Sequence, residues 1–266
     1  MATLVCFHAH PDDEAIATGG TMAKAKRDGH TVVLVLATRG EQGEPVEGVL
    51  NDGELLGDRR SVETQRSADI LGVDRVEFLG YEDSGMIGEP ANDNERCFWQ
   101  ADVEQAAARL AAILDDVDAD ILTIYDPHGG YGHPDHIMVH RAGRRAAEMS
   151  GIDRVFWSTM NRTRFQQQMA ENPDVAAEIG EDREQRLEED EFGLPETEIT
   201  HAIDVMEFID QKRESMAAHA SQIDDDSFFL KMPPDIFAGA FGTEWFVAQG
   251  TTRSGDFGAD LFAEIS

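Results

Sequence analysis

Positive charge is scarce in this sequence. The 266 residues include 53 aspartates and glutamates but only 22 lysines and arginines, which gives a formal net charge of −31. Such an excess of negative charge repels nucleic acids and anionic membranes, so we expect neither as a partner. The excess can attract a divalent cation. It is more typical of a heavily solvated surface suited to high salt, because a metal site needs only a few placed ligands.

Cysteines and long apolar runs are also rare. Cys6 and Cys97 are the two cysteines, and neither belongs to a C-x-x-C motif, which excludes a disulfide framework and a cysteine-based redox site. The sequence has no run of about 18 apolar residues and no basic segment leading into one, so we expect a cytoplasmic protein. It also lacks G-x-G-x-x-G and G-x-x-x-x-G-K-[ST] loops, which argues against nucleotide binding.

What the sequence does contain is a regular alternation of short apolar runs and helical periodicity. Strands are predicted at 2–8, 31–37, 75–79, 120–125, 153–158 and about 199–204. Helices are predicted at 15–28, 57–71, 101–115, 135–149 and 205–220. The alternation predicts an α/β fold, a Rossmann-like three-layer sandwich with a mostly parallel sheet. We expect a single domain over 1–266, with an acidic helical excursion at about 161–199 and long loops at 38–57 and 81–100.

Two polar segments follow strands of this predicted sheet. His10-Pro11-Asp12-Asp13-Glu14 follows the first strand, and "YGHPDH" at 131–136 follows the fourth. Ligands bind at the carboxyl ends of parallel strands, and zinc favours imidazole and carboxylate ligands. His10, Asp13 and one histidine of the second segment would complete a zinc site and leave Asp12 as a base. Either segment alone could be a polar turn that caps a helix, but two at the correct strand ends favour a metal site.

The residues at these two sites carry a resemblance. "AHPDDE" at 9–14 and "GHPDH" at 132–136 resemble the motifs of the PIG-L/LmbE-like family of zinc-dependent N-deacetylases. "YEDSGM" and "YDPHGGYGHPDH" are similar to the branch of this family that acts on mycothiol and its precursor. The resemblance covers roughly residues 2–158, and "HASQ" at 219–222 matches a further family element.

The resemblance implies a role for each motif residue. It implies that His10, Asp13 and His136 bind zinc, although iron(II) also suits such ligands. Asp12 corresponds to the general base. His133 and Tyr131 correspond to groups that act on the reacting carbonyl. Arg60 and Asp83 correspond to residues that contact sugar or inositol hydroxyls.

Several nearby residues are predicted to support the site. Glu14 is expected to bond a ligand histidine or to cap the following helix. Asp135 is expected to hold His133 in one tautomer or to cap its helix. His219 resembles a family position near the pocket, but it could equally be a histidine on a helix surface. His8 is expected to pack or to support the site without binding the metal.

These assignments predict a zinc-dependent hydrolase that removes the N-acetyl group from a small amino sugar, an N-acetylglucosaminyl substrate resembling GlcNAc-inositol. One alternative is an amidase that cleaves a larger acyl group from a mycothiol S-conjugate, and the loops at 38–57 and 81–100 would set the room for that group. The other alternative is a non-catalytic, metal-binding α/β module. Asp12 argues against it, because zinc binding does not require that residue.

Overall fold

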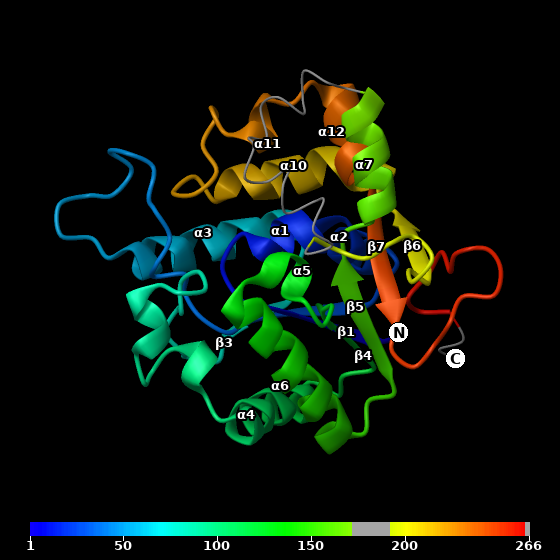
Figure 1. Cartoon of the computed structure of the whole chain (residues 1–266), viewed down its shortest axis with the longest axis horizontal. Coiled ribbons are helices and arrows are strands. Elements are labelled where there is room, and N and C mark those ends of the chain that lie inside the picture. Colours follow the sequence, from blue (N-terminus) through cyan, green and yellow to red (C-terminus); the bar gives the residue numbers. More distant parts are fainter. Residues whose placement is uncertain (172–191, 264–266) are drawn as a thin grey trace.

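The computed structural model describes residues 1–171 and 192–263. Within these ranges seven strands form one sheet in the order β3-β2-β1-β4-β5-β7-β6 (Figure 1). The strands are β1 Thr3–His8, β2 Thr31–Leu36, β3 Arg75–Phe78, β4 Ile121–Tyr125, β5 Arg154–Thr159, β6 His201–Asp204 and β7 Thr243–Ala248. The first five are parallel to one another, which confirms the predicted α/β fold with a mostly parallel sheet.

β7 is the strand that the sequence analysis missed. It runs antiparallel to β5 and to β6, and so separates β6 from the parallel part of the sheet. The apolar run "WFVA" in this segment is typical of a strand, so the signal was present. The predicted strand at about 199–204 is confirmed as β6.

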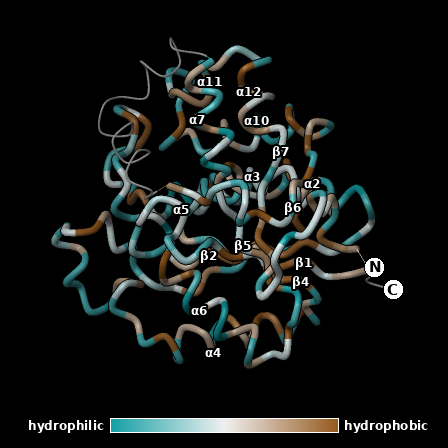
Figure 2. The backbone as a smooth tube through the Cα atoms, turned by 45° about the vertical axis from the view of Figure 1, so that its right-hand side comes forward, coloured by the Kyte–Doolittle hydropathy of each residue, from teal (hydrophilic) through white to brown (hydrophobic). Residues whose placement is uncertain are grey.

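Helices cover both faces of the sheet. Side chains alternate along a strand, and in β1 Val5 and Phe7 pack in the same core as α4 and α6, whereas Leu4 and Cys6 pack with α2 on the other face. The helices are α2 Gly19–Arg27, α3 Leu56–Leu71, α4 Val103–Asp116, α6 Pro134–Ser150 and α10 Ile209–Ala218. Figure 2 shows hydrophobic segments along the central strands. The predicted layers are thus confirmed.

The remaining helices within the described ranges are short and lie mostly in connections. They are α1 Asp13–Ala17, α5 Gly129–Gly132, α7 Arg162–Glu171, α11 Phe228–Lys231 and α12 Pro234–Phe241, with 3₁₀ turns at Pro90–Asp93, Phe98–Gln100 and Met206–Phe208. The helix predicted at 15–28 is two helices, because the backbone of Thr18 (φ −137°) leaves the helical region.

The predicted acidic excursion is described only in part. Its start is helical, as α7, whereas 172–191, with the acidic stretch 181–191, lies outside the described residues. The single-domain assignment stays a prediction. Among the described residues, no helix combines the length and the apolar character that crossing a membrane would require.

A buried ion pair joins the C-terminal part of the chain to the sheet. Lys212 on α10 is 1% exposed, and its Nζ donates to Glu244 Oε1 on β7 at 2.5 Å. The Glu244 carboxylate also accepts from the backbone N–H groups of Gly20 and Thr21, both at 2.8 Å, in the first turn of α2. One carboxylate therefore links β7, α10 and α2, and it satisfies donors that a helix start leaves unpaired.

Removing the lysine should therefore destabilise the fold. We expect Lys212→Met to lower the free energy of unfolding by about 3 kcal/mol, because it leaves the Glu244 charge buried without its cation. Lys231→Met is the matched control: this lysine pairs with Asp226 on the surface, and its removal should change stability by less than about 1 kcal/mol. Urea titrations of both variants measure the difference. Equal stabilities would contradict a structural role for the buried pair.

Candidate metal centre and active site

The predicted site lies where the strand order changes direction. β1 and β4 are neighbours in the sheet, but the chain leaves them toward opposite sides, to β2 and to β5. Ligands in open α/β sheets bind at such a point, outside the carboxyl ends of the strands. The segment 9–14 follows β1 and the segment 126–136 follows β4, so both motifs arrive at this point.

The segment after β4 is shaped by Asp126 and by glycine. The buried Asp126 carboxylate accepts from the N–H groups of His128 (2.9 Å) and Gly130 (3.0 Å) and from the Thr159 hydroxyl (2.6 Å). Gly129 has φ +66°, and a Cβ there would lie 2.6 Å from the Cβ of His136. Glycine is required at this position because the backbone both takes a left-handed conformation and approaches His136 closely.

Three of the predicted ligand atoms converge. Asp13 Oδ2 lies 3.3 Å from His10 Nδ1 and 3.4 Å from His136 Nε2. All three side chains are largely buried, at 13% exposed or less. Ring nitrogens of His10, His133 and His136 also lie within 4.8 Å of one another. The two sequence motifs therefore form one cluster of metal-ligating groups.

The second nitrogen of each ligand histidine is held by an acceptor. His136 Nδ1 lies 3.1 Å from Gly129 O, while its buried Nε2 has no hydrogen-bond partner among the described residues. His10 Nε2 lies 3.1 Å from Asp135 Oδ2 and 3.5 Å from Asp83 Oδ1. An imidazole that donates on one side presents a lone pair on the other, so both rings offer a nitrogen beside Asp13. This arrangement fits a divalent metal.

The charges within the cluster also favour a bound cation. Burial would raise the pKa of Asp13, but His136 and His10 hold it well below its usual value. Burial would lower the pKa of His10, but the surrounding carboxylates, with Asp83 foremost, raise it well above its usual value. The cluster thus requires positive charge, which a proton or a metal cation can supply. Burial, together with His10 and His136, lowers the pKa of His133 to about 2, so that ring is neutral.

Asp12 is held beside the cluster in an unusual backbone conformation. Its φ is +102°, and its N–H donates to Glu14 Oε2 at 2.9 Å. Its Oδ2 lies 3.2 Å from Arg60 Nη2. Burial raises the pKa of Asp12 to about 6, and the Arg60 guanidinium opposes that rise. Asp12 therefore has a strained backbone, and its carboxylate forms an ion pair with the buried Arg60 guanidinium.

Glu14 and His219 form a separate buried pair. Glu14 Oε1 accepts from Ser67 Oγ at 2.7 Å and lies 2.6 Å from His219 Nε2. Burial alone would lower the pKa of His219, but Glu14 raises it. One prediction is corrected here, because the histidine that Glu14 bonds is not a metal-ligand candidate. Of the two readings of His219, the helix-surface histidine is excluded, since His219 is fully buried at the end of α10.

The role predicted for Asp135 is also corrected. Its carboxylate accepts from Ser84 N at 3.0 Å and from the Ser84 hydroxyl, and it faces His10. His133 itself begins α6, since its Nδ1 accepts from the N–H of Asp135 at 3.2 Å. The Asp135 side chain thus orients His10, neither orienting His133 nor capping the helix. Sequence reasoning missed Ser84, which lies 51 residues away with no local signal.

The two residues predicted to contact sugar hydroxyls are buried at the edge of the cluster. Arg60 donates to Gly40 O at 2.9 Å and to Pro11 O, besides its contact with Asp12. Asp83 accepts from the N–H groups of Gln42 (3.1 Å) and Gly85 (2.8 Å). These contacts explain how both are held, and a role in binding sugar stays a prediction.

Tyr131 differs from these buried residues. Tyr131 is 37% exposed as a residue, and its ring packs edge-on against His136, with the ring centroids 4.9 Å apart. Tyr131 therefore lies at the mouth of the cluster.

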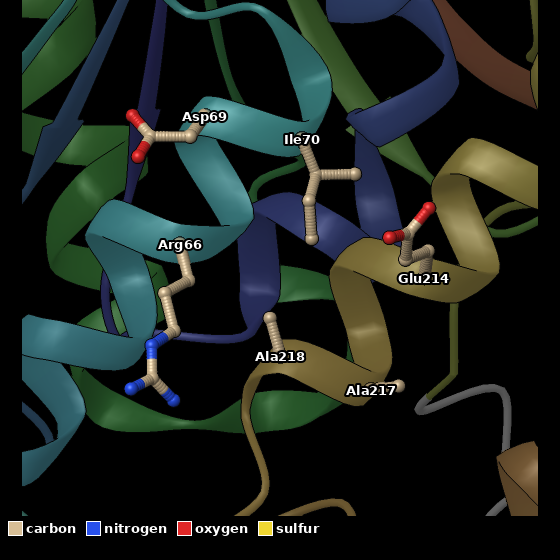
Figure 3. A pocket seen from close by; sticks show the side chains of 6 residues that line it. All are labelled: Arg66, Asp69, Ile70, Glu214, Ala217 and Ala218. Atoms are coloured by element: carbon tan, nitrogen blue, oxygen red, sulfur yellow. The ribbon is translucent and has the colours of Figure 1, made fainter.

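An open groove between α3 and α10 is separate from this cluster. Its lining side chains are shown in Figure 3: Arg66, Asp69, Ile70, Glu214, Ala217 and Ala218. None of the predicted site residues lines it. Two of its lining residues, Arg66 and Ala218, directly precede Ser67 and His219, which are the partners of Glu14.

Comparison with known proteins gives one family. The family model described as PIG-L, GlcNAc-PI de-N-acetylase, matches residues 5–147, more than half of the chain. The chain is 38% identical to the 1D-myo-inositol 2-acetamido-2-deoxy-alpha-D-glucopyranoside deacetylase of Acidothermus cellulolyticus, over 100% of this chain and 96% of that protein. A protein of the same name from Nocardiopsis dassonvillei is 37% identical, over 97% and 99%.

A solved structure supports the fold. The N,N'-diacetylchitobiose deacetylase of Pyrococcus horikoshii superposes with a TM-score of 0.58, over 92% of this chain and 82% of that one, at 22% identity. At this identity the likeness supports the architecture and not the activity.

The close approach at Gly129 yields a testable prediction. We expect Gly129→Ala to weaken zinc binding about tenfold or more, because the new Cβ displaces His136. Gly151→Ala is the matched control. Gly151 also has positive φ (+69°) and lies at the end of α6, the helix that carries His136, but a Cβ there meets no atom within 4 Å. The control should lose about 1 kcal/mol of stability and no zinc affinity. Chelator competition measures both, and equal affinities would contradict the placement of His136.

Proposed function

The chain belongs to the PIG-L family, and from this premise we propose that it is a metal-dependent N-deacetylase. Its substrate is an N-acetylglucosaminyl-inositol, and its products are acetate and the free amino sugar. The observation that carries the proposal is the convergence of His10 Nδ1 and His136 Nε2 on Asp13 Oδ2. The full-length similarity to deacetylases that act on such a substrate supports it.

We propose that His10, Asp13 and His136 hold the metal, zinc or iron(II). When bound there, the cation would polarise the acetamide carbonyl and lower the pKa of a water molecule. The outer hydrogen bonds from the two histidines support this assignment, because they fix which nitrogen faces the metal position.

Asp12 acts as the general base. Its carboxylate accepts a proton from the water as the water oxygen adds to the acetamide carbon. The Arg60 guanidinium stabilises the ionised form of the Asp12 carboxylate, which burial disfavours. The same contact limits the rotation of the Asp12 side chain. The proton then passes to the sugar nitrogen, and the C–N bond breaks to give acetate and an amine.

His133 and Tyr131 stabilise the charge that develops on the carbonyl oxygen. His133 Nδ1 accepts a backbone hydrogen bond, so the neutral ring carries its hydrogen on Nε2 and can donate it. The partly exposed Tyr131 can donate a hydrogen bond from its hydroxyl to the same oxygen, from the mouth of the site. Donors fixed before the reaction stabilise a developing oxyanion without rearrangement.

Substitution of the base tests this function. We expect Asp12→Asn to reduce kcat by about 10²–10⁴-fold while the bound zinc stays at the wild-type level, because only proton transfer is lost. Asparagine tolerates positive φ, so the backbone is kept. Asp118→Asn is the control, since Asp118 has φ +48° on the surface and should retain full activity. Undiminished turnover by Asp12→Asn would overturn the assignment.

The substrate is tested by amine release from three compounds. These are 1D-myo-inositol 2-acetamido-2-deoxy-alpha-D-glucopyranoside, N,N'-diacetylchitobiose and a mycothiol S-conjugate. We expect the highest kcat/KM on the first. A preference for the S-conjugate would instead establish the amidase alternative.

A further inference from the structure

We propose that Tyr125, His8 and Thr18 form a relay that positions the metal ligand His136. The inference rests on the proposed metal centre, and it assigns a role to Tyr125 that no sequence motif indicates. Tyr125 is the last residue of β4 and His8 is the last residue of β1, so the relay lies directly beneath the site.

The Tyr125 ring fixes the plane of His136. The two rings are stacked, with centroids 4.3 Å apart and planes inclined by 8°. His136 Nδ1 is held at the same time by Gly129 O. The hydrogen bond fixes the position of one ring nitrogen, and the parallel ring of Tyr125 restricts the tilt of the imidazole plane. The stack therefore directs Nε2 toward Asp13.

The Tyr125 hydroxyl connects the site to a chain of buried polar groups. Its oxygen lies 2.9 Å from His8 Nδ1, and His8 Nε2 lies 2.8 Å from Thr18 Oγ1. Tyr125 is 5% exposed, and His8 and Thr18 are 1% exposed or less, so water does not compete for these bonds.

Each end of the His8 ring faces a hydroxyl group. The Tyr125 and Thr18 hydroxyls can each donate or accept, so either tautomer of His8 can bond to both of them. Glu14 O, the other oxygen near Thr18 Oγ1, is farther away, at 3.4 Å.

The relay therefore gives His136 a fixed plane, through a stacked ring whose hydroxyl is itself held by His8. Groups that hold metal ligands in place commonly contribute 10–100-fold, roughly, to metal affinity. Tyr125→Phe keeps the stacked ring and removes only the hydroxyl. Thr18→Val keeps the size of the side chain and removes the hydroxyl group at the far end.

The test is the zinc Kd of the full chain, measured by chelator competition. We expect Tyr125→Phe to raise the Kd by about 10–100-fold and Thr18→Val to raise it by less, about tenfold at most. Tyr81→Phe is the control: Tyr81 packs against Phe98 under Arg109, away from the cluster, and its Kd should equal that of the wild type. The melting temperatures of the metal-free variants separate lost folding from lost ligand positioning.

The outcomes are distinct. A wild-type Kd for both Tyr125→Phe and Thr18→Val overturns the relay, as does a wild-type protein that binds no zinc. If Tyr125→Phe fails to fold, the Kd of Thr18→Val decides. If the wild type binds zinc but releases no amine from any acetamide, the proposed function fails, and the comparison of Kd values still decides the relay.

Discussion

The negative charge buried around His10 is the constraint on which the rest of the site depends. Asp13, Asp83 and Asp135 are largely withdrawn from water, and an uncompensated buried carboxylate costs several kcal/mol or more, roughly. Hydrogen bonds from backbone N–H groups and from Ser84 offset part of this cost. The remainder requires a positive charge at the centre of the cluster. The fold therefore favours a cation at the point where His10 Nδ1 and His136 Nε2 both face Asp13.

The three consecutive acids differ in their partners because of the local backbone. α1 begins at Asp13, and successive side chains on a helix point about 100° apart. Asp13 therefore faces the two histidines, while Glu14 turns away into the core toward Ser67 and His219. The positive φ of Asp12 directs its side chain in a third direction, to Arg60. Glu14 Oε2 accepts a hydrogen bond from the Asp12 N–H and so helps hold the strained residue in place.

Sequence reasoning predicted what depends on local pattern and left out what depends on distant partners. The strands β1 to β5 and the convergence of the motifs follow from apolar runs and from the geometry of parallel sheets. The partner of Asp135 could not be read from the sequence, because Ser84 arrives from the loop after β3. Nor could the role of Tyr125, since an aromatic residue at the end of a buried strand ordinarily only packs. The split at Thr18 depends on one residue's backbone angles.

The loop that follows β2, which we expect to set the room for the acyl group, is hydrogen-bonded to the edge of the candidate metal centre. Gln42 donates to Asp83, Glu41 accepts from the Asp83 N–H at 3.2 Å, and Val46 donates to Ser221 O at 2.9 Å. A change at 40–46 that alters the room for an acyl group therefore also moves Asp83, which lies 3.5 Å from His10 Nε2. The exposed turn at 51–53 has no such bond to the cluster among the contacts described. Substitutions at 51–53 are therefore expected to leave Asp83 and His10 in place, whereas substitutions at 40–46 are expected to shift them.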